Sequence, residues 1–179
     1  MSTLATFIAV STIITIAVVI VLWIVSTQQR LAVLDDNISE SMSQIEAQLE
    51  SRFDALKTLL NLTTGYARHE SDVLMETIKS GSNAITAAES TPSDVMRQEG
   101  MITEALGRIA LVAEQYPELK ASQTYTQTMG TVETFENMVH ISRLIYNDSV
   151  TKLNREIRIF PVSMVAGMLG FQQRAHLEE

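Results

Sequence analysis

The chain has 179 residues, which is enough for one domain with an ordinary hydrophobic core. Its formal net charge of −8 argues against nucleic acid as a partner, because phosphate neutralisation requires a basic face. The absence of cysteine excludes disulfides, thiolate metal sites and cysteine nucleophiles. Aromatic residues make up only 6% of the chain, whereas helix formers such as Ala, Leu and Glu are common, which favours an all-α fold.

The first element predicted along the chain is a membrane span. Residues 4–25 read LATFIAVSTIITIAVVIVLWIV, and hydroxyl groups are their only strongly polar side-chain groups. As a helix, this stretch spans about 33 Å, close to the roughly 30 Å hydrocarbon core of a bilayer. A cleaved signal peptide would carry basic residues before a shorter apolar run, and a buried core helix would have a polar face. Residues 1–29 are therefore predicted to form a single-pass transmembrane anchor.

The orientation of the anchor depends on one residue. Arg30 is the only basic residue close to the span, and it lies on the C-terminal side. The positive-inside rule therefore favours a cytoplasmic bundle, with a periplasmic or extracellular bundle as the alternative.

The anchor is predicted to continue into the first helix of the bundle. Residues 1–64 contain neither Gly nor Pro, so nothing breaks the backbone between lipid and water. Beyond the span, apolar residues recur every three or four positions, as on one face of a helix. These residues are Leu31, Leu34, Ile38, Met42, Ile45, Leu49, Phe53, Leu56 and Leu60. Gly65 is the first residue that favours a helix end.

Three more helices are predicted, over about 68–89, 92–115 and 122–158. Thr91-Pro92-Ser93-Asp94 has the N-cap residue, first-turn proline and first-turn acid of a helix start, and Tyr116-Pro117 ends that helix. Residues 30–160 are thus expected to form an antiparallel, up-and-down four-helix bundle. The alternative keeps Gly65 inside one long kinked first helix, which leaves three helices. Phe160-Pro161 stops the last helix, and an apolar and basic tail follows over residues 161–179.

The sequence contains no convincing catalytic or cofactor motif. Glu136 and His140 lie four apart on one helix, and His69 and Asp72 lie three apart on another. The paired Glu-x-x-His motifs of carboxylate-bridged metal bundles are missing, so these side chains are interpreted as solvated. His176 is given no role. No catalytic residue, metal site or cofactor is predicted, and no small-molecule substrate is identified.

The tail is the feature that suggests binding. In an up-and-down bundle of four helices the chain returns to the end where it began, so residues 162–171 (VSMVAGMLGF) are expected beside the membrane. The basic residues Lys152, Arg155, Arg158 and Arg174 flank this stretch. An apolar patch bordered by cations is typical of a segment on anionic lipid. Lipid, a partner chain and the bundle itself remain the three alternatives for what covers it.

Self-association is expected at the same end. A single chain is predicted to leave both the stripe that begins at Leu31 and the apolar tail uncovered, which costs about 25 cal/mol per Å² of apolar surface. First helices should therefore pack side by side in a homo-oligomer, with Asp35, Asp36 and Glu40 facing Arg155 and Arg158 of the same or an adjacent chain. The alternative is a monomer in which the fourth helix alone covers the first. The predicted lipid or oligomer contacts are Leu31, Leu34, Asp35, Asp36, Arg155, Arg158, Met164, Val165, Met168 and Leu169.

Three separated blocks of the chain resemble a known family. They are IEAQLESRFDALKTLLNLTTGYARHE (45–70), AEQYPELKA (113–121) and RLIYNDSVTKLNREIRIFPVSMVAGMLGF (143–171). The matched motifs are Gly65-Tyr66-Ala67, Tyr116-Pro117-Glu118-Leu119-Lys120, Tyr146-Asn147-Asp148 and Phe160-Pro161. On these residues the chain is similar to the LemA family of bacterial membrane proteins. It departs from the family at Met42, where a tryptophan is usual, and at Lys57, where a proline is usual; losing that proline should straighten the first helix.

The resemblance implies a helical bundle on a single membrane anchor with no known enzymatic activity. One branch of the family is associated with building magnetosome membranes. The matched residues are expected to be structural, with Tyr116-Pro117-Glu118 as a turn between helices and with Tyr146 and Asn147 as interhelical contacts.

The sequence therefore predicts a non-enzymatic scaffold in a bacterial inner membrane that self-assembles and organises or shapes the membrane. The alternative is an accessory subunit or metal-dependent component that positions a membrane partner. Expected partners are membrane lipid, further copies of the chain and a possible membrane-protein partner.

Overall fold

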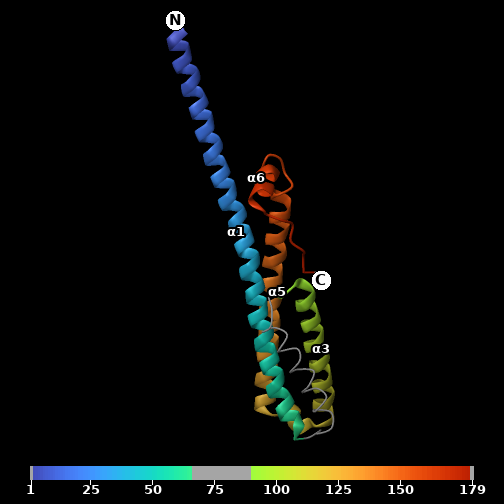
Figure 1. The fold of residues 1–179 in the computed structure, drawn as a ribbon. Coiled ribbons are helices and arrows are strands. Elements are labelled where there is room, and N and C mark those ends of the chain that lie inside the picture. Colours follow the sequence, from blue (N-terminus) through green and yellow to red (C-terminus); the bar gives the residue numbers. More distant parts are fainter. Residues whose placement is uncertain (1, 66–89, 178–179) are drawn as a thin grey trace. The chain divides into compact units, whose positions relative to one another are not determined.

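The computed structural model describes residues 2–65 and 90–177, and the regular secondary structure in these ranges is entirely α-helical (Figure 1). The helices are α1 (Ser2–Thr64), α3 (Pro92–Gln115), α4 (Pro117–Lys120), α5 (Gln123–Glu156) and α6 (Val162–Leu169). The prediction of an all-α fold is confirmed. The helix predicted over 68–89 lies outside the described residues, and so does the choice between a three-helix and a four-helix bundle.

The predicted continuity between span and bundle helix is confirmed by α1, a single helix of 63 residues. It passes Met42 and Lys57 without a break and ends one residue before Gly65. Within the apolar segment, the hydroxyls of Thr12 and Thr15 donate hydrogen bonds to carbonyls four residues earlier, at 2.8 and 2.9 Å. The helix therefore satisfies these polar groups internally, as a bilayer requires.

The starts and ends of α3 follow local sequence signals. The Thr91 hydroxyl accepts a hydrogen bond from the Asp94 amide at 3.3 Å, and the Asp94 carboxylate accepts one from the Thr91 amide at 3.2 Å. This reciprocal capping box, with Pro92 in the first turn, confirms the predicted helix start. At the other end, Tyr116-Pro117 separates α3 from the single turn of α4, which confirms the predicted turn between helices.

The chain forms two compact units, and α1 and α5 each contribute to both. Unit 1 comprises Met1–Asn37 and Asp148–Arg174, and unit 2 comprises Ile38–Asn147 and Ala175–Glu179.

The core of unit 2 is built from the apolar rows of α1, α3 and α5. Its fully buried members include Ile45, Leu49, Phe53, Leu56, Leu59, Ile102, Ile109 and Val139. Except for Leu59, the α1 members are those that the three-four spacing predicts for one helix face. Burial of such residues in a shared core is what stabilises helices that are individually marginal in water.

Ion pairs connect the described helices of unit 2. Arg143 on α5 pairs with Glu99 on α3 at 2.9 Å, and Arg52 on α1 pairs with Glu136 on α5 at 3.4 Å. The Arg52 side chain is almost completely buried, and this burial lowers its pKa, although Glu136 and Glu99 act in the opposite direction. The polar layer thus orients α1 and α3 against α5 at the expense of desolvating one guanidinium.

Candidate membrane-proximal site

The apolar segment of α1 is exposed along its length. Among the described residues, α1 is the one helix long and apolar enough to cross a membrane, by length and composition; its most apolar stretch has a mean hydropathy of 2.9 and is 0% buried. From Thr27 onward the pattern changes, because Thr27 and Leu31 are buried within unit 1. The Thr27 hydroxyl donates to the Trp23 carbonyl at 2.9 Å. The boundary between exposed and packed helix therefore lies immediately after the predicted span.

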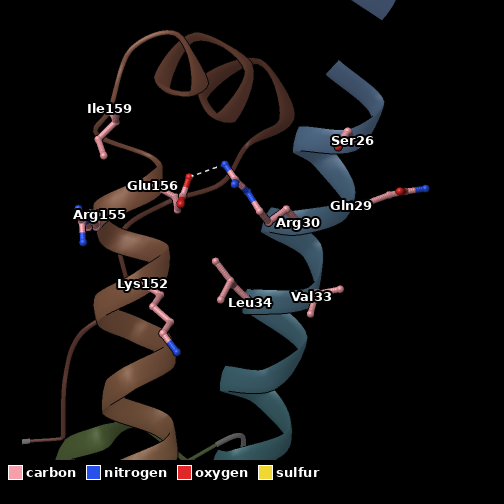
Figure 2. Close-up of a pocket in the computed structure, with 9 residues that line it drawn as sticks. All are labelled: Ser26, Gln29, Arg30, Val33, Leu34, Lys152, Arg155, Glu156 and Ile159. Carbon is pink, nitrogen blue, oxygen red and sulfur yellow. Dashed lines mark hydrogen bonds and ion pairs between the residues drawn. The ribbon is translucent and has the colours of Figure 1, made fainter. Parts of the chain in front are cut away.

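A groove lies where α1 and the end of α5 face each other in unit 1 (Figure 2). It measures about 780 Å³, and Arg30 on α1 crosses it to pair with Glu156 on α5 at 2.8 Å. Leu34 points into the space between the two helices (Figure 2), and Arg155 on α5 is among the residues that line the groove. Because Arg30 is largely exposed, this ion pair contributes little to stability; it helps to fix the position of α1 along α5.

The short helix α6 follows directly on a turn at the end of α5. Val162, Val165 and Ala166 are buried, so one side of α6 packs within unit 1. Met164 and Met168 of α6 are exposed, and so is Phe160 in the turn before the helix. The peptide bond between Phe160 and Pro161 is cis. The tail segment predicted from sequence as merely apolar therefore contains a helix that has apolar residues on both sides.

Two features tie α6 back to the rest of unit 1. Gly170 has a φ of 80°, a left-handed conformation that suits glycine at a helix end, and the Phe171 amide donates to the Ala166 carbonyl at 3.0 Å. Beyond this cap, the Arg174 guanidinium donates to the Asp35 carboxylate at 2.9 Å. Asn154 on α5 also binds Arg174, because its side-chain amide donates to the Arg174 carbonyl at 2.8 Å and accepts from the Arg174 amide at 2.9 Å.

In unit 2, a second set of hydrogen bonds attaches the C-terminal segment to α5. The Asn147 side chain donates to the Leu177 carbonyl at 2.9 Å and accepts from its amide at 2.8 Å, while the Tyr146 hydroxyl donates to the Ala175 carbonyl at 2.9 Å. These bonds hold the C-terminal segment, and the expected interhelical contacts of Tyr146 and Asn147 stay a prediction. Asn154 and Arg174 were missed as a pair, and the recurrence of Asn seven residues apart on α5 was the available signal.

The ten residues predicted as lipid or oligomer contacts all fall in unit 1. Met164, Met168, Leu169, Asp36, Arg155 and Arg158 are exposed, and Leu34 and Asp35 are partly buried. Leu31 is 0% exposed and Val165 only 6%, so the expectation that a single chain leaves these two uncovered was wrong. The physical reason is that α5 and α6 fold back within the same unit. Asp35 is bound by Arg174, and its contact with an adjacent chain stays a prediction.

The alternative metal ligands are not brought together by the described part of the chain. His140 is exposed, and Glu136 is engaged with Arg52. Across residues 2–65 and 90–177, no group of three or more His, Asp or Glu side chains has the arrangement of a metal site. His69 and Asp72 lie outside the described residues.

Comparisons with known proteins agree with the blocks found in the sequence. The sequence model of the LemA family matches residues 41–179. Magnetosome proteins MamQ 1 and MamQ 2 of Paramagnetospirillum magneticum are each 22% identical over 170 residues, covering 82% of this chain and 62% of the relative. Protein LemA of Metamycoplasma hominis is 26% identical over 136 residues, covering 75% of this chain and 61% of the relative.

The chain thus spans about three fifths of the length of the curated relatives that it matches. The exposed apolar segment of α1 and the resemblance to these relatives fit a membrane protein. Because the family match extends over most of its length, the chain belongs to the LemA family.

Proposed function

We propose that this protein is a non-enzymatic scaffold, anchored in a bacterial inner membrane, that self-assembles and organises the membrane around it. One observation carries the proposal: a single unbroken helix contains both an exposed apolar segment of membrane-spanning length and a row of core residues of unit 2. A helix of this kind couples lipid to a folded helical part without a flexible linker.

The finer architecture belongs to the same proposal. Residues 1–29 form the anchor, and residues 30–160 form an antiparallel four-helix bundle that lies in the cytoplasm. The names of the magnetosome relatives support a role at a membrane by analogy, and a shared fold does not by itself transfer function.

Self-assembly is supported by apolar side chains that remain exposed outside the span. On α5, Met138, Ile141, Leu144 and Ile145 form an exposed apolar row. On α1, Val33 is exposed and Leu34 partly so. Contiguous exposed apolar surface of this kind marks interaction sites, and anchorage in one plane raises the effective concentration of copies that could cover it.

The size of the full-length protein in mild detergent tests self-assembly. We expect an oligomer for the parent chain and dissociation for a variant combining Ile141→Asp with Ile145→Asp, because a charge on each residue opposes burial between copies. Asn137→Asp, which places the same charge at an exposed polar position of α5, should leave the size unchanged. Leu34→Asp tests the α1 contact in the same way. A monodisperse parent monomer, or an oligomer indifferent to all these changes, would overturn the proposal.

Two further measurements test the remaining parts. In intact spheroplasts the bundle should resist added protease, and digestion there would place it on the outer side. Metal analysis of the purified protein tests the non-enzymatic assignment. Stoichiometric iron, manganese or zinc that is lost on His140→Ala would replace it with the metal-dependent alternative.

A further inference from the structure

The composition of α6 is unusual for a short surface helix. Its sequence, VSMVAGML, has no charged residue and only one hydroxyl. The buried side of α6 uses Val162, Val165 and Ala166. Met164 and Met168 lie four residues apart on α6, so they share one face of the helix, and they are 62% and 85% exposed. Phe160 lies in the turn before α6 and is 75% exposed. A helix that is apolar on both sides needs a second apolar environment beyond its own protein core.

The position of α6 in unit 1 identifies that environment. Figure 1 shows α6 beside α1, and in Figure 2 the helical turns that follow Ile159 lie at the level of the α1 turn that carries Ser26. Trp23 lies one turn earlier on α1, and the apolar segment ends at about residue 25. If the span lies in a bilayer, the exposed face of α6 is at the depth where the hydrocarbon gives way to headgroups, which is also where an indole is favoured.

The charged residues near α6 also fit a position at the membrane interface. Lys152 and Arg155 lie at the end of α5, and Arg158 lies in the turn between α5 and α6. All three side chains are exposed. In one leaflet of a bilayer, the acyl chains adjoin a layer of phosphate groups. Exposed apolar side chains on α6 with arginines next to them match these two layers. Long arginine side chains can reach such phosphates while their stems stay near the apolar region.

Contacts within unit 1 hold α6 in place beside α1. The Gly170 cap ends the helix, and Arg174 is bound to both Asp35 on α1 and Asn154 on α5. The loop that carries α6 is therefore closed onto the same helix that enters the membrane.

We infer that α6 is a lipid-binding element that inserts Phe160, Met164 and Met168 into the leaflet that surrounds the C-terminal end of the span. Arg155 and Arg158 bind the phosphates of anionic lipids in that leaflet. The inference rests on the membrane anchorage proposed above and adds a second, interfacial contact with lipid. A chain attached in this way has a fixed orientation about its span, which a single transmembrane helix does not provide.

The test uses the absence of cysteine, which allows one fluorophore to be placed by a single substitution. The full chain carrying Met168→Cys with an environment-sensitive dye is reconstituted into vesicles of phosphatidylcholine with phosphatidylglycerol. Spin-labelled lipids with the quencher at shallow or deep acyl positions report depth. Val19→Cys labels the span as the reference, and Gln173→Cys labels an exposed polar position of the same unit.

We expect shallow quenchers to quench the dye at position 168 more strongly than deep ones, with the reverse at position 19 and little quenching at position 173. Replacing Arg155 and Arg158 by Gln should weaken insertion in anionic vesicles about fivefold for each charge removed, and should have little effect in phosphatidylcholine alone.

The failures of the two proposals are distinguishable. If position 19 is not quenched, the anchorage itself is wrong. If position 19 is quenched but the dye at position 168 is open to aqueous iodide, α6 remains in water and this inference is wrong. A dye at position 168 that is shielded from both iodide and lipid quenchers is covered by protein, such as a second copy, and this also overturns the inference.

Discussion

Units 1 and 2 use their apolar residues differently. In unit 2, the Phe53 side chain is completely buried and belongs to a core assembled from α1, α3 and α5. In unit 1, Phe160 is mostly exposed, as are the side chains of the span. The described part of unit 2 leaves mainly one row on α5 uncovered. The difference indicates that unit 2 completes most of its burial within one chain, whereas unit 1 is built for a surrounding apolar phase.

The ion pairs that connect helices in the two units also differ in how exposed they are. The Arg143–Glu99 pair of unit 2 has side chains only 19% and 17% exposed, whereas Arg30 and Arg174 of unit 1 are more than half exposed. Buried pairs are sensitive to loss of one partner, while exposed pairs are screened by water and salt. The two units should therefore respond very differently to chemically similar substitutions.

The largest expected contrast is between the two phenylalanines. Phe53→Ala should lower the free energy of unfolding by about 3–5 kcal/mol, because it removes a fully buried ring and leaves a cavity. Phe160→Ala should change it by less than about 0.5 kcal/mol in detergent, because that ring contacts little of the protein. Urea unfolding followed by circular dichroism measures both. Similar losses for the two variants would show that the comparison between units is wrong.

The arginines of unit 2 provide the next contrast. Arg143→Ala should destabilise by about 1–3 kcal/mol, because it leaves Glu99 charged in a mostly buried position. Arg52→Met should be neutral or stabilising by up to about 1 kcal/mol, because Glu136 is 63% exposed and stays hydrated. Burial lowers the pKa of Arg52, so its charged form is disfavoured in the folded protein. Equal destabilisation by both changes would contradict this assignment.

The cap of α3 is expected to have a smaller effect. Thr91→Ala should cost about 1 kcal/mol, and Thr103→Ala, which removes a hydroxyl from the middle of the same helix, serves as the control. Hydrogen bonds from the Thr91 side chain and backbone lower the pKa of Asp94. The stabilisation from Asp94 is therefore complete above the ordinary carboxyl pKa and is lost as the pH falls through the lowered value. Urea titrations at neutral and acidic pH should show the Thr91→Ala deficit shrinking in acid, and a deficit that grows would refute the linkage.

Loss of the hydrogen bonds that attach the C-terminal segment to α5 should have the smallest effect on global stability. Asn154→Ala and Asn147→Ala are each expected to cost about 1 kcal/mol or less, since the bonds that they remove lie near the surface. Hydrogen exchange separates them locally. Exchange at the Arg174 amide should rise with Asn154→Ala, and exchange at the Leu177 amide should rise with Asn147→Ala. If either change accelerates exchange at both amides equally, the segment is released as a whole and the two attachments are not independent.

Local signals made much of the fold predictable. The lack of Gly and Pro before residue 65 predicted the length of α1, and Thr91-Pro92 and Tyr116-Pro117 predicted both ends of α3. These features depend on a few adjacent residues, so the sequence contains all the information needed. By contrast, α6 was predicted only as an apolar tail, because eight residues with no side-chain N-cap and an interior Gly167 give a weak helical signal.

The candidate site was less predictable because it depends on contacts between distant parts of the chain. Arg158 and Asp35 belong to unit 1 together with the predicted span, but the burial of Leu31 depends on α5 and α6 folding back within that unit. The partner of Asp35 is Arg174, 139 residues away, and any of several basic residues satisfied the sequence pattern equally well. Periodicity identifies which face of a helix is apolar and does not identify what covers it.

The central claim is that the exposed part of α1 lies in lipid, and cysteine reactivity tests it most directly. Ile14 and Leu111 have nearly equal side-chain exposure in the isolated chain, at 58% and 61%, so any difference between them in vesicles comes from the bilayer. Single variants Ile14→Cys and Leu111→Cys are reconstituted into vesicles that are then opened by a pore-forming peptide and treated with a charged maleimide. Membrane anchorage predicts rapid modification at position 111 and almost none at position 14. Equal modification at the two positions would contradict it.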